Sequence, residues 1–399
     1  FYENEIGKEN KNLGRAGLLP NVGINYQAQR NRSDLTNEIG GKDLVTHPEY
    51  ISRSAGITLR QPLLNMEAIA RYRQGKVQTE QSAAQFDTRG AEMIVRVAGA
   101  YLDVLLAEDT LTLARAQRDT FAEQAKVNQR MFEKGEGTRT DMLETAARLD
   151  QAEAAVLEAQ DTVTVNRNTL EGLIKMEPGH LQRLGTPYRP PQLKPASFEE
   201  WRAIALANNS DIRAATLAAE VARLEIDRAR AGHLPRVDFI ATYSKSTADT
   251  VNTYTQTNLN RALGVQVNVP LYSGGQVSAG TRQAVAGYGR AKADLEARSD
   301  RVLVDLRKAH TAAVSSVARV AALEKAVESA QLLTRATEQS IKGGVRINLD
   351  LLTAQQQLSN VQRDLAQARY NNLMALLRLR AAAGTLTSSD LHEISGYFK

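Results

Sequence analysis

The chain has 399 residues and a formal net charge of +5, and its lysines and arginines are interspersed with glutamates and aspartates. This pattern favours a solvated helical surface over a nucleic-acid footprint, so no nucleic-acid partner is expected. The absence of cysteine excludes disulfides, zinc–thiolate sites and thiol catalysis. The sequence contains no run of about 20 apolar residues, so no transmembrane helix is expected.

The first segments predict the end of a helix followed by two strands. Residue 1 lies inside a helical pattern that Pro20 stops, so a processed N-terminus is expected. Apolar and polar residues then alternate over about 20–32 and about 53–62, which is the period of a strand. The polar residues 31–53 are predicted to form a loop. Strands with one apolar face suit a membrane barrel, although a half-buried soluble hairpin fits the same alternation.

Two helices of unequal length follow the strands. The segment from about 66 to 134 has a helical pattern without proline, which corresponds to a helix roughly 100 Å long at about 1.5 Å per residue. The segment over about 139–176 predicts a returning helix of half that length. Prolines then cluster in 178–197, which predicts an extended linker because proline cannot continue a helix.

The second half predicts the same kinds of element. Helices are expected over about 198–230, 276–342 and 349–383, strands over about 235–245 and 261–270, and a tail over 385–399. Half-length helices stacked end to end would match the long ones in height, so the chain would supply four columns of a helical tube. The linker and the tail are then expected at mid-height, in an equatorial belt.

An internal duplication relates residues 1–177 to residues 198–384. The span from Pro62 to Gly135 differs by a single residue from the span between Pro270 and Gly344. Helices that run side by side tolerate little change in length, whereas a surface loop tolerates more. We therefore interpret the nearly constant span as a structural constraint on two copies of one unit.

Each copy carries a glycine-bearing hairpin end between its long and its short helix. Gly135 is followed by Asp141, and Gly344 by Asp350 at the same spacing. Glycine can end a helix in the left-handed conformation, and an aspartate favours the first turn of the next helix. A role for Asp141 and Asp350 at these helix N-termini is therefore one interpretation of both residues.

Four strands cannot close a membrane barrel, so membrane strands would require an oligomer. Catalytic, cofactor and metal sites are not expected. Gly275, Gly280 and Thr281 resemble part of a phosphate-binding loop, but the lysine of that motif is absent and Arg282 follows instead. The five histidines are isolated and lack the spacing of metal ligands.

Several motifs together resemble the TolC family of Gram-negative outer-membrane channel-tunnels, and the resemblance covers essentially the whole chain. They are residues 367–373 (QARYNNL), residues 383–386 (AGTL), residues 270–275 (PLYSGG) and the two hairpin ends with Gly-x5-Asp. The resemblance implies a mostly α, α+β membrane protein that forms a homotrimer. Its strands would make one twelve-stranded barrel in outer-membrane lipid, and its helices a periplasmic tunnel.

The resemblance also implies a gate and a docking surface at the hairpin ends. In the closed tunnel, Thr140 and Asp141 would receive Arg346 from the other hairpin, and three copies of Asp350 would form an acidic ring that prefers cations. Two positions depart from the best-known pattern, where Ile341 replaces a tyrosine and Thr353 an aspartate. A periplasmic adaptor would dock at the hairpin ends, through Gly135, Glu136, Gly137, Thr138, Gly344 and Val345.

Among the branches of the family, the chain looks most like the outer-membrane component of type I protein secretion, of the alkaline-protease exporter kind. The resemblance implies a passive exit duct that works with a periplasmic membrane-fusion adaptor protein and an inner-membrane ABC transporter, and that has no enzymatic activity. One alternative is the outer-membrane component of a multidrug or metal efflux pump. An alternative from another class is a soluble coiled-coil scaffold.

Overall fold

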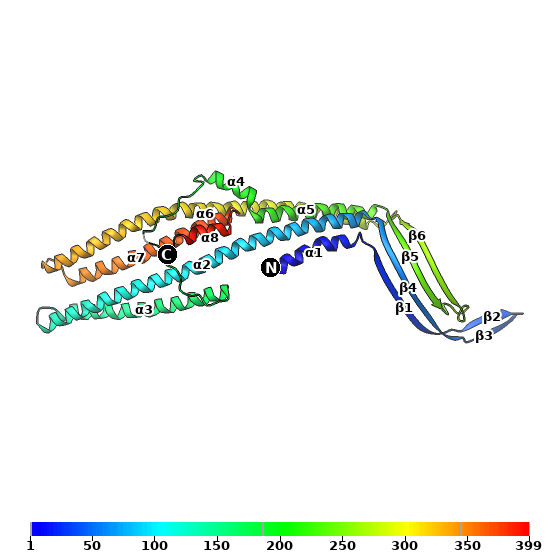
Figure 1. Ribbon diagram of the computed structural model, residues 1–399, viewed down its shortest axis with the longest axis horizontal. Helices are drawn as coiled ribbons and strands as arrows, with labels where there is room; N and C mark the ends of the chain where they lie inside the picture. Colours follow the sequence, from blue (N-terminus) through cyan, green and yellow to red (C-terminus); the bar gives the residue numbers. More distant parts are fainter. Residues whose placement is uncertain (1, 186, 344, 399) are drawn as a thin grey trace. The chain divides into compact units, whose positions relative to one another are not determined.

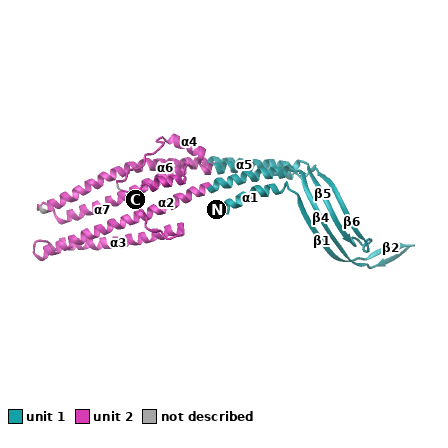
Figure 2. Ribbon diagram, in the orientation of Figure 1, with its two compact units in different colours: residues 1–86, 213–297 teal, residues 87–212, 298–399 magenta. Residues whose placement is uncertain are grey.

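A computed structural model describes residues 2–185, 187–343 and 345–398, most of which are helical (Figure 1). Contacts divide the chain into two compact units (Figure 2). Unit 1 consists of Phe1–Phe86 and Arg213–Ala297, and unit 2 of Asp87–Ile212 and Arg298–Lys399. Each unit therefore takes one part of each sequence repeat. The two long helices, α2 (Met66–Glu133) and α6 (Gln276–Lys342), contribute to both units.

Unit 1 contains a four-stranded antiparallel sheet. Its strands lie in the order β1 (Asn21–Arg32), β4 (Glu49–Leu64), β5 (Arg236–Thr247) and β6 (Thr257–Asn268). Strands that are far apart in the sequence, β4 and β5, form the centre of the sheet. Within one chain β1 and β6 are edge strands, so four strands leave the barrel open.

The register of this sheet separates an apolar face from a polar face. Ile24 lies opposite Ile57, which lies opposite Tyr243, so apolar side chains collect on one face. The apolar face comprises Val22, Ile24, Tyr26, Ile57, Leu59, Phe239, Ala241, Tyr243, Leu263, Val265 and Val267. The opposite face carries mainly polar residues, among them Asn25, Gln27, Thr58, Thr242, Asn260 and Gln266. Most of the apolar residues are exposed to solvent in a single chain, which is costly in water and favourable in lipid.

The prediction of a loop over residues 31–53 is wrong, because strands occupy most of this segment. β1 continues to Arg32 and β4 begins at Glu49, and a hairpin of β2 (Leu35–Ile39) and β3 (Lys42–Thr46) lies between them. Gly40 and Gly41 connect β2 to β3 with φ of +63° and +77°. Two adjacent left-handed residues make the two-residue turn that fits the twist of a hairpin, and glycine adopts that conformation without strain.

Unit 1 also holds α1 (Tyr2–Ala16), which packs closely on the first part of α2. A Cβ atom at Gly75 would lie 2.4 Å from the carbonyl oxygen of Asn10, and one at Gly14 would lie 2.8 Å from that of Arg71. No side chain fits into either space, so these two glycines permit backbone-to-backbone contact between α1 and α2. No helix among the described residues has the length and apolar character needed to cross a membrane.

Unit 2 contains the returning helices α3 (Arg139–Ile174) and α7 (Asn348–Ala382) with parts of α2 and α6. Its largest apolar cluster joins α2, α6 and α7 to the linker and the tail, through Leu102, Leu105, Val320, Leu373, Leu377, Tyr188, Ile394 and Phe398. Gly185 in the linker donates its N–H to the carbonyl of Tyr397 at 2.8 Å, and Leu184 forms an isolated β-bridge with Phe398. The linker and the tail therefore pack together on these helices.

The prediction of one continuous helix over 198–230 is also corrected. The segment forms two helices, α4 (Phe198–Asn208) and α5 (Ser210–Arg230). Asn209 separates them with extended backbone geometry. Its side-chain oxygen accepts hydrogen bonds from the N–H groups of Asp211 and Ile212, while its amide donates to the carbonyl of Ala382 at 2.9 Å. Asparagine is a favourable N-cap, so it starts a new helix here rather than continuing the old one.

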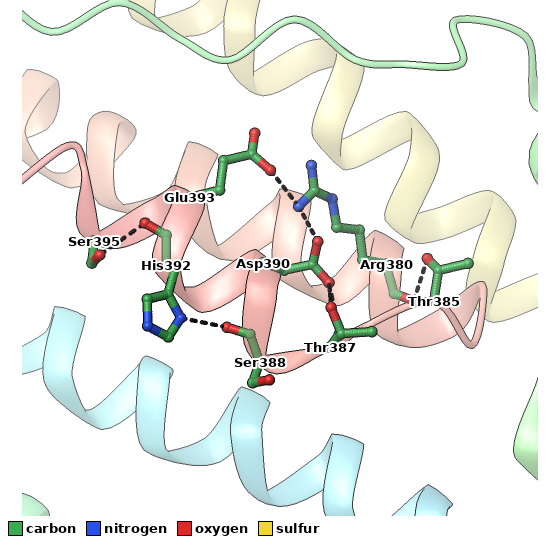
Figure 3. A network of polar contacts seen from close by, with 8 residues as sticks. All are labelled: Arg380, Thr385, Thr387, Ser388, Asp390, His392, Glu393 and Ser395. Carbon is green, nitrogen blue, oxygen red and sulfur yellow. Dashed lines mark hydrogen bonds and ion pairs between the residues drawn. The ribbon is translucent and has the colours of Figure 1, made fainter.

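The predicted tail contains a short helix, α8 (Ser388–Ser395), that a charged network fastens to α7 (Figure 3). Arg380 donates to a carboxylate oxygen of Asp390 at 2.5 Å and to one of Glu393 at 2.8 Å. Asp390 also accepts from the backbone N–H of Thr387, which completes a capping box. Arg380 and Asp390 are largely buried, and a charged pair with satisfied partners tolerates such burial.

A second buried polar contact joins α7 to α2. The phenol of Tyr370 donates to a carboxylate oxygen of Asp109 at 2.6 Å. Burial, and then this hydrogen bond, raises the pKa of Tyr370 well above the usual value for a tyrosine, so the phenol keeps its proton at neutral pH. Tyr370 belongs to the QARYNNL motif, and its place in the core gives that motif a structural role.

Candidate functional site

The first hairpin end joins α2 to α3 through a tight, hydrogen-bonded turn. Gly135 has a φ of +75°, and the N–H groups of Glu136 and Gly137 both donate to the carbonyl of Met131. This is the glycine-terminated helix end that the sequence predicts. Thr138 is the N-cap of α3, where its hydroxyl accepts from the N–H of Asp141 at 3.0 Å and donates to its carboxylate at 2.6 Å.

The second hairpin end joins α6 to α7 and lacks a comparable cap. Ile347 occupies the N-cap position, and its side chain makes no capping hydrogen bond. Asp350 lies in the first turn of α7, and its N–H donates to the carbonyl of Ile347 at 3.2 Å. Val345 projects into solvent with 82% of its surface exposed. Gly344, which the sequence assigns to the docking surface, lies outside the described residues.

The predicted gate residues lie at both hairpin ends, but a single chain does not bring all of them together. Thr140 and Arg346 are exposed, and Asp141 is held by the N-cap of its own helix. Among the described residues of one chain, Arg346 and the carboxylate of Asp350 form no ion pair, so both can meet a second copy. Ile341, which is half-buried, has no hydrogen-bonding group, and the Thr353 hydroxyl donates to the carbonyl of Leu349 at 2.9 Å.

A polar layer close to the ends links the two hairpins within one chain. Asn128 of α2 and Asn348 of α7 both donate to the hydroxyl of Thr145 on α3, at 2.7 and 3.2 Å. Gln124 of α2 donates to the side-chain oxygen of Asn348 at 2.9 Å. The Asn128–Thr145 hydrogen bond lies within one hairpin, so separating the hairpins would break the two bonds that Asn348 makes, one of them to the buried Thr145.

An apolar layer and a second polar layer lie further along the same helices. Phe121, Ala152 and Leu352 are buried and pack together, with Leu149 against them. Beyond them, Gln117 of α2 donates to Gln356 of α7 at 2.7 Å and accepts from Ser359 at 2.8 Å. We call these three layers the inter-hairpin seam. It comprises Gln117, Phe121, Gln124, Asn128, Thr145, Leu149, Ala152, Asn348, Leu352, Gln356 and Ser359.

Reasoning from the sequence did not find the inter-hairpin seam. Its members recur every three or four residues along α2 and α7, which is the signal of a helix face that contacts another helix. That periodicity does not indicate which helix a face contacts. Most of its glutamines and asparagines also look like solvated surface residues, because their partners lie more than 200 positions away in the sequence.

Reversible, non-covalent contacts hold the two hairpins together near their ends. Within the described residues, no group of three or more histidine, aspartate or glutamate side chains could hold a metal ion. Amide hydrogen bonds and the contacts of one apolar layer can break and form again without covalent change.

Comparisons with known proteins agree on one family. The family model for "Outer membrane efflux protein" matches residues 6–174 and 201–385, which covers both sequence repeats. The alkaline protease secretion protein AprF of Pseudomonas aeruginosa is 40% identical over 400 residues, which span all of this chain and 83% of AprF. The outer membrane protein TolC of Vibrio cholerae is 30% identical over 96% of this chain and 86% of TolC.

A solved structure supports the fold. The outer membrane protein VceC of Vibrio cholerae superposes with a TM-score of 0.81, covering 96% of this chain and 91% of VceC at 17% identity. At that identity the likeness concerns the fold alone. The resemblance to the TolC family is confirmed, and the alternative of a soluble coiled-coil scaffold is wrong. With a family model that spans both repeats and relatives 30% and 40% identical along nearly all of its length, this chain belongs to the outer membrane efflux protein family.

Proposed function

We propose that this chain is the outer-membrane exit duct of a type I secretion system and that its cargo is an unfolded, protease-type protein. The observation that carries the proposal is the 40% identity to an alkaline protease secretion protein, which extends along the whole chain. Export of this kind needs a passage that opens and closes and no chemistry of its own. The hairpin ends supply contacts of that sort, and the duct is proposed to be passive rather than enzymatic.

The duct is proposed to be a homotrimer in which β6 of one copy pairs with β1 of the next. Both edge strands carry unpaired backbone groups in a single chain, and lipid offers these groups no hydrogen bonds. Three sheets of four strands would exceed the minimum of about eight strands for a membrane barrel. The polar face of the sheet would then line the passage and the apolar face would contact lipid.

The hairpin ends are proposed to form the gate of the trimer. Arg346 of one copy would donate to Thr140 and Asp141 of its neighbour, and three copies of Asp350 would meet near the axis. Arg346 is exposed, and the carboxylate of Asp350 forms no ion pair among the described residues of one chain, which supports this assignment. Like charges held together in a constriction attract cations, so the acidic ring would make the passage cation-selective.

Opening the gate is proposed to part the inter-hairpin seam. An adaptor that binds the exposed ends near Gly135, Glu136, Gly137, Thr138 and Val345 could draw the α6–α7 hairpin away from the α2–α3 hairpin. The polar layers of the seam lower the cost of such a movement, because water can replace their hydrogen bonds. A seam packed only with large apolar side chains would resist opening more strongly.

A multidrug or metal efflux channel is the second candidate function. The description of the matching family favours it, since that description refers to efflux. The two functions use the same kind of passage and differ in the transporter that the adaptor recruits. The cargo therefore has to be distinguished in cells.

The proposal is tested by complementation. A Gram-negative strain that carries a protease, its ABC transporter and its adaptor, but lacks the outer-membrane component, should release protease into the medium when it expresses this chain. Omitting the transporter is the matched control and should abolish release. Protease retained in the cells, together with restored resistance to toxic compounds, would contradict protein export and favour efflux.

A further inference from the structure

A row of basic residues crosses the sheet at the end that bears the loops. Arg30 lies on β1, Arg53 on β4, Lys245 on β5 and Arg261 on β6, and all four side chains are exposed. The register places each on the same face as the apolar residues. Arg53 lies opposite Ala28, Lys245 opposite Ala55 and Arg261 opposite Tyr243.

Neighbouring members of this basic row are offset by two residues across each pair of strands. Arg53 pairs with Thr247, two residues from Lys245. In the same way, Arg30 pairs with a residue two positions from Arg53, and Lys245 with one two positions from Arg261. Diagonal neighbours in a sheet lie about 7–8 Å apart, so four positive charges form a continuous line. Like charges at this spacing repel one another, and an anionic ligand would relieve that repulsion.

The opposite face at the same level carries no charge. There, Gln27, Gln29, Ser54, Ser246 and Asn260 occupy the positions between the basic residues. At this level of the sheet, the basic residues therefore lie only on the face that is proposed to contact lipid.

Two tyrosines lie at the level of the basic row, on the same face of the sheet. Tyr26 is in register with Lys245 through Ala55, and Tyr243 lies directly opposite Arg261, which sits over its ring at 5.6 Å. Tyrosines mark the level at which hydrocarbon gives way to lipid headgroups. Glu49 is the one acidic residue on this face of the four strands, and its carboxylate pairs with Arg30 and Arg32 at 3.1 and 3.6 Å. Arg53, Lys245 and Arg261 form no such pair with any described residue.

From this arrangement we infer that the basic row binds the phosphate groups of lipopolysaccharide, the phosphorylated glycolipid of the outer leaflet. The inference rests on the outer-membrane placement of the family and on a periplasmic position of the helices, which turns the loop end of the sheet outward. It is independent of the cargo. Guanidinium and ammonium groups donate charge-assisted hydrogen bonds to phosphate, and the apolar band below them would contact the acyl chains of the same lipid.

The test measures binding of diphosphoryl lipid A and of fully dephosphorylated lipid A to the full chain purified in a neutral detergent. Wild type should prefer the diphosphoryl form at least tenfold, and this measurement needs no variant. The double variant Arg53→Gln/Lys245→Gln should weaken binding of diphosphoryl lipid A by about 30-fold. The matched variant Lys42→Gln/Arg236→Gln removes two exposed cations that lie outside the row and should bind as wild type does.

Three outcomes would overturn the inference. Wild type could bind both lipid A forms equally, or the two double variants could weaken binding equally. Inorganic phosphate at the same phosphate concentration could compete fully with lipid A, which would identify a free anion rather than a lipid headgroup as the ligand. The inference would stand if secretion failed, because lipid binding and protease release are measured separately.

Discussion

Arg346→Ala is expected to raise the single-channel conductance of the protein in planar bilayers severalfold. In the closed gate, each Arg346 side chain would donate charged hydrogen bonds to Thr140 and Asp141 of a neighbouring copy. A hydrogen bond to a charged group contributes about 1.5–3 kcal/mol, and the closed ring would contain this link three times. Its loss would shift the equilibrium from closed towards open by more than a factor of ten.

The control for this prediction is Arg319→Ala, which removes an exposed arginine of α6 that lies away from the hairpin end. Its conductance should equal that of wild type. Adding Asp141→Ala to Arg346→Ala should change the conductance little, because both members of one pair are then absent. Equal conductance of wild type and Arg346→Ala would remove Arg346 from the gate.

A covalent bond across the inter-hairpin seam is expected to abolish secretion. Thr145 and Asn348 belong to different hairpins, and their side chains meet at 3.2 Å, so cysteines at both positions should form a disulfide on oxidation. The chain has no other cysteine to compete. If opening parts the seam, the oxidised pair would hold the gate closed, and a reductant should restore release of protease into the medium.

The matched control for this cross-link is Asn128→Cys/Thr145→Cys. These two side chains meet at 2.7 Å but lie on α2 and α3, within one hairpin. A disulfide there should leave secretion intact, because each hairpin is proposed to move as one body. Normal secretion by the oxidised Thr145→Cys/Asn348→Cys variant would show that opening does not part the seam.

Much of the fold could be predicted because its elements have strong periods. The sequence places the first long helix over about 66–134, and α2 spans Met66–Glu133. Strand alternation locates β1 and β4–β6 within a few residues, since one face of each must be apolar. Glycine marks the end of α2 because Gly135 adopts a left-handed conformation.

The remaining features depend on single residues or on distant partners. Gly40 and Gly41 turn a predicted loop into a hairpin, and Asn209 breaks a predicted helix by capping the next one. Neither the turn nor the helix break alters the spacing of apolar residues around it, so the hydrophobic pattern does not reveal them. The basic row on the sheet emerges only when the register of four strands is known. The inter-hairpin seam likewise requires the contact between α3 and α7, which no local pattern specifies.

The assignment of the gate residues remains a prediction for a related reason. The proposed partners of Arg346 and Asp350 belong to other copies of the chain. The structure of a single chain therefore does not contain the contacts that would test this assignment. The central claim is therefore that this chain is an incomplete part of a hollow assembly.

Imaging single particles of the purified protein in lipid nanodiscs by electron microscopy tests this claim most directly. We predict three chains per particle around one continuous hollow axis, with β6 of each chain paired to β1 of the next. Particles that contain one chain, or several chains without a shared channel, would contradict it.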